Sequence, residues 1–125
     1  MEKNANKSKC PSTGKIGERI ALAYLENNGY LIREKNYRFG RGEIDIIAEK
    51  DQKLIFFEVK TKKFGDFGDP INWITRKKQL QISRVARGYL YENNIVDKDC
   101  QFDVITLSWE GGTYSLNHIE NAFWL

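Results

Sequence analysis

Four charged residues in two neighbouring segments have the types and the spacing that chemistry on a phosphate requires. Glu43 and Asp45 stand two residues apart in one segment, and Glu58 and Lys60 stand two residues apart in the next. Residues two apart on a β-strand share one face, so each pair would present both side chains together. A divalent cation between two carboxylates would offset their repulsion, and a lysine beside it would orient an attacking water or balance charge on a phosphate.

The two segments are predicted to be the strands of a β-hairpin. Apolar-rich runs at Ile44–Ala48 and Leu54–Val59 flank a polar stretch, although its turn lacks the glycine that makes a hairpin signature strong. A turn at Asp51–Gln52 pairs Lys50 with Lys53 and thereby sets the register of both strands.

This register brings two carboxylates together. Counting back from the turn places Asp45 opposite Glu58, and Glu43 opposite Lys60. Opposed side chains have Cβ atoms about 5 Å apart, and like charges at that distance repel by roughly 3 kcal/mol at an effective dielectric of about 20. A bound cation would explain such a pair beside Ile and Phe. The ordinary alternative is a solvent-facing hairpin with a Glu43–Lys60 ion pair and the other two carboxylates relaxed into water.

A helix is predicted over Lys15–Asn28, and it carries an acidic residue on an apolar face. Glu18 stands three and seven residues before Ala21 and Leu25, so it shares a face with predicted core residues. Two explanations are equally open. An acid near the helix start is favoured by the helix dipole, or the carboxylate serves the site.

The rest of the chain predicts an α/β domain. A first strand is expected at Tyr30–Arg38, a second helix at Arg76–Asn93 with Thr75 as its cap, and a second hairpin at Gln101–Trp109 and Thr113–Glu120. Helix, strand, hairpin, helix and hairpin in this order predict a mixed central sheet flanked by helices.

Length and composition describe one globular domain. The chain has 125 residues, of which 41% are hydrophobic and 30% charged, so it can form one core but not two ordinary ones. Residues 1–13 are expected to form a disordered arm, and residues 14–125 the domain. No run reaches the length of a membrane span, and Met1–Cys10 is too polar for a signal peptide. Cys10 and Cys100 form neither a metal-binding spacing nor a disulfide framework, so a reducing cytoplasm is the expected compartment.

Basic residues cluster in three places, although the net charge is only +3. The predicted contacts to nucleic acid are Arg38, Arg41, Lys62, Lys63, Lys77 and Lys78. Three basic residues crowd the first turn of the second helix against its dipole, which points to an anion nearby. Ordinary solvated faces would explain any single cluster equally well.

Aromatic residues are interleaved with charges after the central hairpin. Phe64, Phe67 and Trp73 have the setting of side chains that stack on unpaired bases. Folding back onto the core is the alternative, and it is favoured for Trp73.

Two titratable residues and the C-terminus complete the candidates. Asp103 is expected at an edge or a turn rather than in the site. His118 is the only histidine and has no serine or cysteine in a nucleophile setting, which disfavours triad chemistry. The apolar ending Asn121–Leu125 is expected to dock on the sheet or on a second subunit.

The central motif resembles a known family. Gly42-Glu43-Ile44-Asp45 followed by Phe57-Glu58-Val59-Lys60-Thr61 resembles the YraN family, small uncharacterised bacterial proteins of the PD-(D/E)XK nuclease superfamily that are similar to archaeal Holliday-junction resolvases. The resemblance runs from about Gly14 to the C-terminus.

This resemblance implies a restriction-endonuclease-like core and a set of site residues. Asp45 and Glu58 would bind Mg²⁺ or Mn²⁺ together with the backbone carbonyl of Val59. Lys60 would position water and stabilise negative charge during attack on the phosphodiester. Related nucleases carry a glutamate on the first helix that points at the metal site, which favours a catalytic role for Glu18.

The resulting hypothesis is an endonuclease that uses Mg²⁺ or Mn²⁺ to cut DNA, with branched and single-stranded DNA as open alternatives. In the superfamily a residue of the second helix often assists the site; Lys77 is the first candidate, with Lys78 and Gln79 as alternatives. A homodimer would match a two-fold junction. The rival hypotheses are a non-catalytic nucleic-acid-binding module in a repair or processing complex, and an interaction protein whose acidic pair is incidental.

Overall fold

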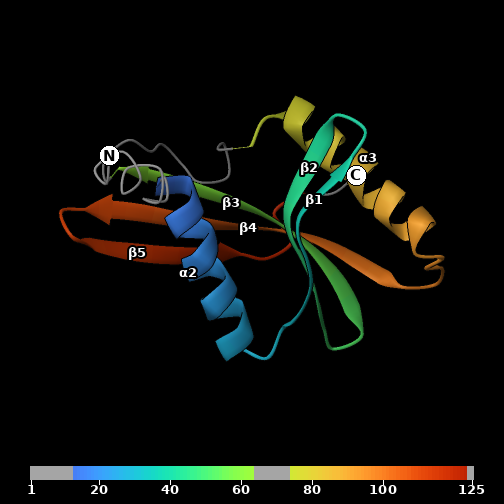
Figure 1. Ribbon diagram of the computed structural model, residues 1–125, viewed down its shortest axis with the longest axis horizontal. Coiled ribbons are helices and arrows are strands. Elements are labelled where there is room, and N and C mark those ends of the chain that lie inside the picture. The colour runs from blue at the N-terminus through green and yellow to red at the C-terminus, as the bar shows by residue number, and fades with distance from the viewer. Residues whose placement is uncertain (1–12, 64–73, 124–125) are drawn as a thin grey trace, which may run out of the picture.

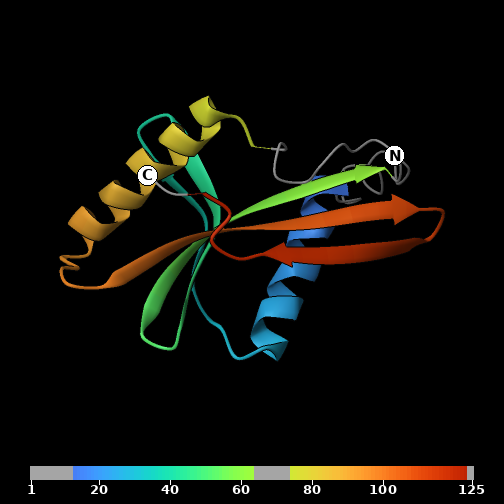
Figure 2. The same cartoon turned by 180° about the vertical axis from the view of Figure 1, so that it is seen from behind.

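Two helices pack on opposite faces of a five-stranded sheet in the computed structural model, which describes residues 13–63 and 74–123. The expected N-terminal arm, Cys10, and the aromatic residues Phe64, Phe67 and Trp73 lie outside the described residues. Helix α2 crosses in front of β4 and β5 in Figure 1 and behind them in Figure 2, whereas α3 lies on the other side. Neither described helix is long and apolar enough to cross a lipid bilayer.

The order of the elements is the one that the sequence predicts. The elements are α2 (Thr13–Asn27), β1 (Leu31–Phe39), β2 (Gly42–Lys50), β3 (Lys53–Lys63), α3 (Arg76–Glu92), β4 (Asp99–Glu110) and β5 (Thr113–Ile119). Most bounds agree with the expected ones within two residues. Thr75 caps α3 as predicted, because its Oγ1 accepts a hydrogen bond of 3.1 Å from the backbone N–H of Lys78.

The sheet is mixed, which confirms the expected α/β class. Its strands lie in the order β1-β2-β3-β4-β5. Strands β3 and β4 are parallel, and all other neighbours are antiparallel. Helix α3 lies in the crossover that the parallel pair requires. The sheet therefore presents one face to each helix.

Each face of the sheet has its own core. The core under α3, here the α3-side core, includes Ile82, Val85, Ala86 and Tyr89 of the predicted helix stripe. The core under α2, here the α2-side core, includes Ala21 and Leu25 of that helix together with Ile46, Ala48, Ile55, Phe57, Ile105 and Leu107 of the strands. Burial on both faces explains why β2 and β3 are apolar in long runs.

The described part of the C-terminus docks on its own sheet. Phe123 is buried in the α3-side core, and its ring stacks on Phe102 with centroids 5.1 Å apart. The backbone N–H of Ala122 donates to the Phe102 carbonyl at 2.8 Å. Of the two docking surfaces expected for Asn121–Leu125, the described residues therefore use the sheet.

Asp103 does not lie at an edge or a turn, so that expectation was wrong. It is 1% exposed in β4, between β3 and β5, and its carboxylate accepts bonds from Gln101 Nε2 and the backbone N–H of Asn121, both at 3.0 Å. His118 Nε2 lies 2.7 Å from the same carboxylate, and its Nδ1 lies 2.8 Å from the Tyr24 hydroxyl. A neutral imidazole with its proton on Nε2 satisfies both bonds, so this network ties α2 to the sheet.

Helix α2 rests directly on the sheet at Gly17. A Cβ atom added at Gly17 would overlap Thr61 Oγ1 of β3, while the next nearest atoms, Leu107 Cδ1 and Thr61 Cβ, would lie at 3.4 and 3.5 Å. The missing side chain therefore sets the distance from the sheet at which Glu18, the next residue, is held.

The Gly17→Ala substitution should lower the free energy of unfolding by about 1–3 kcal/mol, because the added methyl group overpacks the contact with Thr61. In a Thr61→Ala background the overlapping hydroxyl is gone, so the same substitution should cost little or stabilise the helix by up to about 1 kcal/mol. Urea unfolding of the two single variants and the double variant measures this difference. Equal effects of Gly17→Ala in both backgrounds would contradict the proposed contact.

Candidate functional site

Strands β2 and β3 separate where the acidic residues begin. The expected turn at Asp51 and Gln52 forms, with φ values of 53° and 66°, and Lys50 pairs with Lys53 as predicted. The pairing continues only as far as Ile46 with Phe57. Asp45 and Glu58 would be the next pair, but the strands have parted there.

Beyond the last β2–β3 pair, a side chain of β2 replaces the backbone carbonyl as the acceptor of the next hydrogen bond from β3. The backbone N–H of Val59 donates to Asp45 Oδ2 at 2.8 Å. A residue in a strand directs its N–H and its C=O to the same side, so the Val59 carbonyl also faces the gap in which Asp45 lies. A carboxylate can accept about four hydrogen bonds, and the bond to Val59 leaves Asp45 with capacity for a further ligand.

Strand β2 changes face at Asp45. Ile44 belongs to the α3-side core and Ile46 to the α2-side core, although two residues apart on a regular strand would share a face. The strict alternation assumed from the sequence therefore fails at this position. Asp45 lies at the change of face, partly buried, with the helices on either side of it.

Glu58 is a buried carboxylate held between two lysines. It is 6% exposed, and its Oε2 lies 3.6 Å from Lys60 Nζ and 3.9 Å from Lys78 Nζ. Lys78 also donates to Gln81 Oε1 at 3.2 Å. Among the candidates on the second helix, Lys78 contacts the site, whereas Lys77 is exposed and Gln79 donates to the Ile74 carbonyl.

Glu18 and Glu43 meet at Asn36, which was not among the predicted site residues. With its amide nitrogen toward the carboxylates, Asn36 donates to Glu18 Oε1 at 3.2 Å and to Glu43 Oε2 at 2.9 Å. Glu43 pairs with Arg38 at 3.5 Å, so its expected pairing with Lys60 was wrong.

The structure also removes the ordinary explanation for Glu18. Because α2 begins at Thr13, its first turn holds no acidic residue, and Glu18 lies beyond the reach of a first-turn dipole effect. The side chain is partly buried and adds negative potential at Asp45.

Burial and like charge shift the titration of the carboxylates. Burial raises the pKa of Asp45 to about 7, and the negative charges of Glu58, Glu18 and Glu43 add to the rise, against the opposing hydrogen bond from Val59. Burial also raises the pKa of Glu58, although the ammonium groups of Lys78 and Lys60 oppose the shift. Near neutral pH a bound cation could therefore replace the proton on Asp45.

The donor set fits a divalent cation of the Mg²⁺ type. Two carboxylates with raised pKa values and a backbone carbonyl on the same side provide hard oxygen ligands, and such ions keep several waters. In residues 13–63 and 74–123 no three His, Cys, Asp or Glu side chains converge into a ready-made metal cluster. The candidate protein ligands are Asp45, Glu58 and the backbone carbonyl of Val59.

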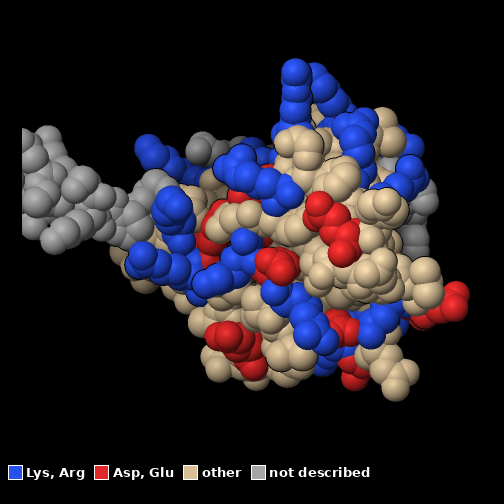
Figure 3. All heavy atoms as spheres, turned by 45° about the vertical axis from the view of Figure 1, so that its right-hand side comes forward, with Lys and Arg blue, Asp and Glu red and all other residues tan. Residues whose placement is uncertain are grey.

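The basic residues predicted to contact nucleic acid lie on several elements, and of these Lys78 contacts Glu58 directly. Arg38 and Arg41 are exposed at the β1–β2 turn, Lys62 and Lys63 are exposed at the end of β3, and Lys77 is exposed at the start of α3. Figure 3 shows Lys and Arg side chains spread over one face, with Asp and Glu side chains between them. Cationic side chains near an acidic centre would draw a polyanion toward that centre.

Comparison with known proteins places the chain in a family. The model of "Uncharacterised protein family UPF0102" matches residues 17–107, most of the chain. The chain belongs to the UPF0102 family. The matched segment contains Glu18, Asp45, Glu58, Lys60 and Lys78, and it ends before Trp109 and His118.

Relatives of nearly the same length come from diverse bacteria. A UPF0102 protein of Alkaliphilus oremlandii is 46% identical over 112 residues, which cover 88% of this chain and 96% of the relative. A UPF0102 protein of Geobacter metallireducens is 41% identical over 112 residues, covering 90% and 92%. A third, of Chlorobium phaeobacteroides, is 42% identical over 113 residues, covering 86% and 89%.

Sequence reasoning missed Asn36 because nothing in its neighbourhood marks it. The residue adopts a φ of 51° inside β1, a conformation that asparagine tolerates better than most residues. A lone asparagine in a polar strand carries no such signal in the sequence. The pairing of β1 with β2 brings it beside Glu43, and the packing of α2 against β1 brings it beside Glu18.

The raised pKa of Asp45 predicts a pH-dependent stability difference. Between about pH 4 and 7, folded protein holds a proton that the unfolded chain has lost, so ionisation of Asp45 lowers the free energy of unfolding as pH rises. The slope contributed is at most about 1.4 kcal/mol per pH unit. Asp45→Asn keeps an oxygen for the Val59 N–H but cannot ionise.

Urea unfolding in metal-free buffer at several pH values measures this difference. The stability of Asp45→Asn relative to wild type should rise with pH up to about 7 and then level off, since wild-type Asp45 is fully ionised above its pKa. Asp51→Asn, at the exposed hairpin turn, is the matched control, and its free energy of unfolding should change with pH as that of wild type does. Parallel curves for Asp45→Asn as well would show that the pKa of Asp45 is not raised.

Proposed function

We propose that this protein is a Mg²⁺- or Mn²⁺-dependent endonuclease that hydrolyses phosphodiester bonds in DNA, with a restriction-endonuclease-like core of the PD-(D/E)XK type. The observation that carries the proposal is the pair of carboxylates at the opening between β2 and β3, Glu58 buried and Asp45 partly buried, with a lysine of β3 against Glu58. A site selected for stability alone would not keep two such groups with raised pKa values together.

The residues have distinct roles in this proposal. Asp45 and Glu58 would hold the cation together with the Val59 carbonyl. A divalent cation bound there supplies Lewis-acid polarisation of a phosphoryl oxygen and lowers the pKa of water. Lys60, 3.6 Å from Glu58, would orient the attacking water and stabilise the negative charge that develops on the phosphate. Glu18 would hold a second cation or its water.

Lys78 and Lys60 connect cation binding to substrate binding. Both ammonium groups balance the charge of Glu58 while no cation is bound there. A cation taking over Glu58 would leave these ammonium groups to pair with phosphate oxygens. Cation and DNA should therefore bind cooperatively, since each favours the arrangement that the other requires.

A second candidate function is a nucleic-acid-binding module without catalysis. It is favoured by the two lysines that already satisfy Glu58, and by the lack of a third ligand-type side chain at the pair in the described part of the chain. Such a module would keep the basic face and its salt dependence but would not need a cation.

Cation binding should stabilise the folded protein through the proposed ligands. At a Mg²⁺ or Mn²⁺ concentration 100 times the dissociation constant, the free energy of unfolding should rise by about 2.7 kcal/mol. Thermal unfolding above pH 7 measures the shift in Tm, which Glu58→Gln and Asp45→Asn should each abolish. Glu110→Gln, on the exposed β4–β5 turn, is the matched control and should respond like wild type. An equal rise in Tm on adding the cation to all variants would overturn the proposed metal site.

Cleavage of labelled single strands, duplexes, flaps and four-way junctions with Mn²⁺, Mg²⁺ or EDTA tests the activity itself. Wild type should cut at least one of these DNAs only with a cation, and Asp45→Asn should not. Lys60→Ala should lose about 10²–10³-fold in rate, because a group that stabilises transition-state charge is gone. Lys53→Ala, at the hairpin turn, should cut like wild type.

The same assay separates the two candidate functions. Binding that weakens steeply with salt but is never followed by cutting would favour the binding module. Cutting by Lys60→Ala at the wild-type rate would overturn the role given to Lys60.

A further inference from the structure

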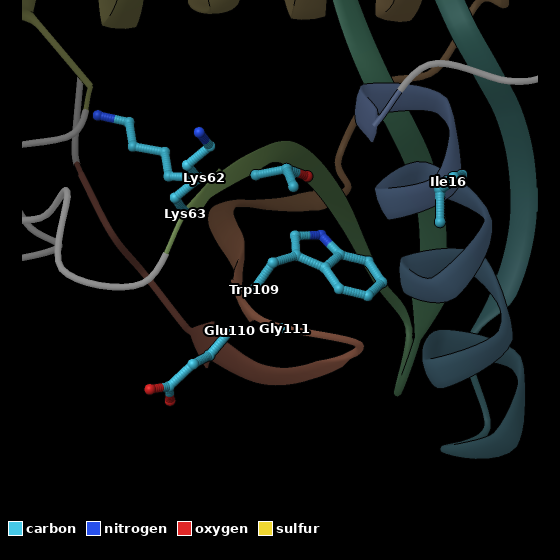
Figure 4. A pocket seen from close by; sticks show the side chains of 7 residues that line it. Ile16, Lys62, Lys63, Trp109, Glu110 and Gly111 are labelled. Atoms are coloured by element: carbon cyan, nitrogen blue, oxygen red, sulfur yellow. The ribbon is translucent and has the colours of Figure 1, made fainter.

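A pocket of about 740 Å³ lies at the far end of β3, beyond the acidic site. Its described walls are Ile16 of α2, Thr61–Lys63 of β3, and Trp109 with the adjoining turn Glu110–Gly111. The volume lies within the range of small-ligand sites, about 300–1,000 Å³. Figure 4 shows the indole ring of Trp109 between the helix that carries Ile16 and the end of β3 that carries Lys62 and Lys63.

Trp109, in the wall of this pocket, carries a buried polar group that lacks a hydrogen-bond partner among the described residues. Its Nε1 atom is buried and has no hydrogen-bond partner among the residues that the structure describes. A buried donor without an acceptor is destabilising, and native proteins rarely retain one without a reason. The ring itself is held by Tyr114 of β5, with centroids 5.1 Å apart and planes at 56°. The indole ring is therefore fixed in position by its packing on Tyr114, and the N–H on its edge has no acceptor among the described residues.

We propose that this pocket binds one unpaired nucleobase of the DNA strand that is cut. The inference rests on the proposed nuclease function in taking the ligand to be DNA. The base would stack on the face of the Trp109 indole. Because the Nε1–H bond lies in the plane of that ring, its acceptor would be a neighbouring sugar or phosphate oxygen of the strand and not the stacked base itself. Stacking of bases on aromatic side chains and cationic grooves along the backbone are the usual means of binding single strands.

Continuity with the acidic site favours a nucleobase over another flat ligand. Ile16 stands two residues before Glu18 on α2, and Lys62 stands two residues after Lys60 on β3. Two residues of a strand span about 7 Å, so a DNA backbone that binds Lys60 and Lys62 would pass around the end of β3 to reach the pocket, which lies on the α2 side of the sheet. Lys62 and Lys63 at the rim match the flanking phosphates, while Glu110 on the other side would turn the backbone toward the lysines.

This placement predicts the shape of the preferred substrate. A base inside a duplex is paired and stacked, so it can enter the pocket only after it has been taken out of the stack, which costs a few kcal/mol. Single strands, flaps and junctions with unpaired bases avoid that cost. The pocket therefore selects against intact duplex.

The test uses a single-stranded DNA of about 12 nucleotides in which 2-aminopurine, and separately an abasic residue, is moved from position to position. Binding is measured in Ca²⁺ with Lys60→Ala as the background, so that the strand stays intact. One position should lose 2-aminopurine fluorescence on binding through stacking on Trp109. Trp109→Leu should abolish this quenching and weaken binding about 5- to 150-fold. The exposed Tyr91→Leu is the matched control and should do neither.

A double-mutant comparison isolates the contact. An abasic residue at the quenched position should weaken binding to the Trp109-containing protein, but should cost little in Trp109→Leu, because both changes remove one interaction. Trp109→Phe should retain most of the quenching while losing the hydrogen bond. Far-UV circular dichroism and Tm confirm that each variant is folded.

The outcomes for the pocket and for the nuclease are distinguishable. One contrary result is that the abasic residue and Trp109→Leu lower the binding free energy additively, and another is that folded Trp109→Leu binds as wild type does. Either result would overturn the proposal that the pocket binds a base, even if wild type cuts DNA. Quenching that depends on Trp109, without cutting by wild type under any metal condition, would support the pocket and overturn the nuclease.

Discussion

Strands β2 and β3 can separate at the acidic site because one side chain replaces one backbone acceptor. In a continued ladder the N–H of Val59 would bond to β2 near Ile44, but it donates instead to Asp45 Oδ2 at 2.8 Å. A buried N–H with no acceptor would cost about 1–3 kcal/mol, so the opening depends on this carboxylate. The gap that results is where the Val59 carbonyl, Asp45 and Glu58 come together.

The carboxylates of this protein fall into two physical classes. Asp103 is 1% exposed, yet Gln101, His118 and the backbone of Asn121 satisfy it, and it lies within a network that ends at Tyr24. Donors of this kind stabilise a buried acid and leave it little capacity for a ligand. It has a structural role in the attachment of α2.

Asp45 and Glu58 belong to the other class. Burial raises the pKa of both, and the lysines that face Glu58 oppose that shift without removing it. Their contacts come from β2, β3 and α3, while Glu18 of α2 adds negative charge. Four elements of the fold therefore converge on this pair of carboxylates, and the proposed cation would complete the balance of their charge.

The sequence by itself determined the order and kind of the elements and the register of the central hairpin. Its apolar periodicity predicted both helices, and the turn at Asp51–Gln52 set the pairing of Lys50 with Lys53. These features depend on residues close together in the chain, whose spacing the pattern reports directly. The same spacing pointed to Asp45, Glu58 and Lys60 as one group.

Only the tertiary structure decided how that group is arranged. Period two assumed a regular strand, whereas β2 presents Ile44 to the α3-side core and Ile46 to the α2-side core. The choice of Lys78 over its neighbours depends on how α3 packs on the sheet. The contacts of Asn36 depend on the pairing of β1 with β2 and on the packing of α2 against β1. These contacts join residues far apart in the chain, and their distances are set by packing that no local pattern records.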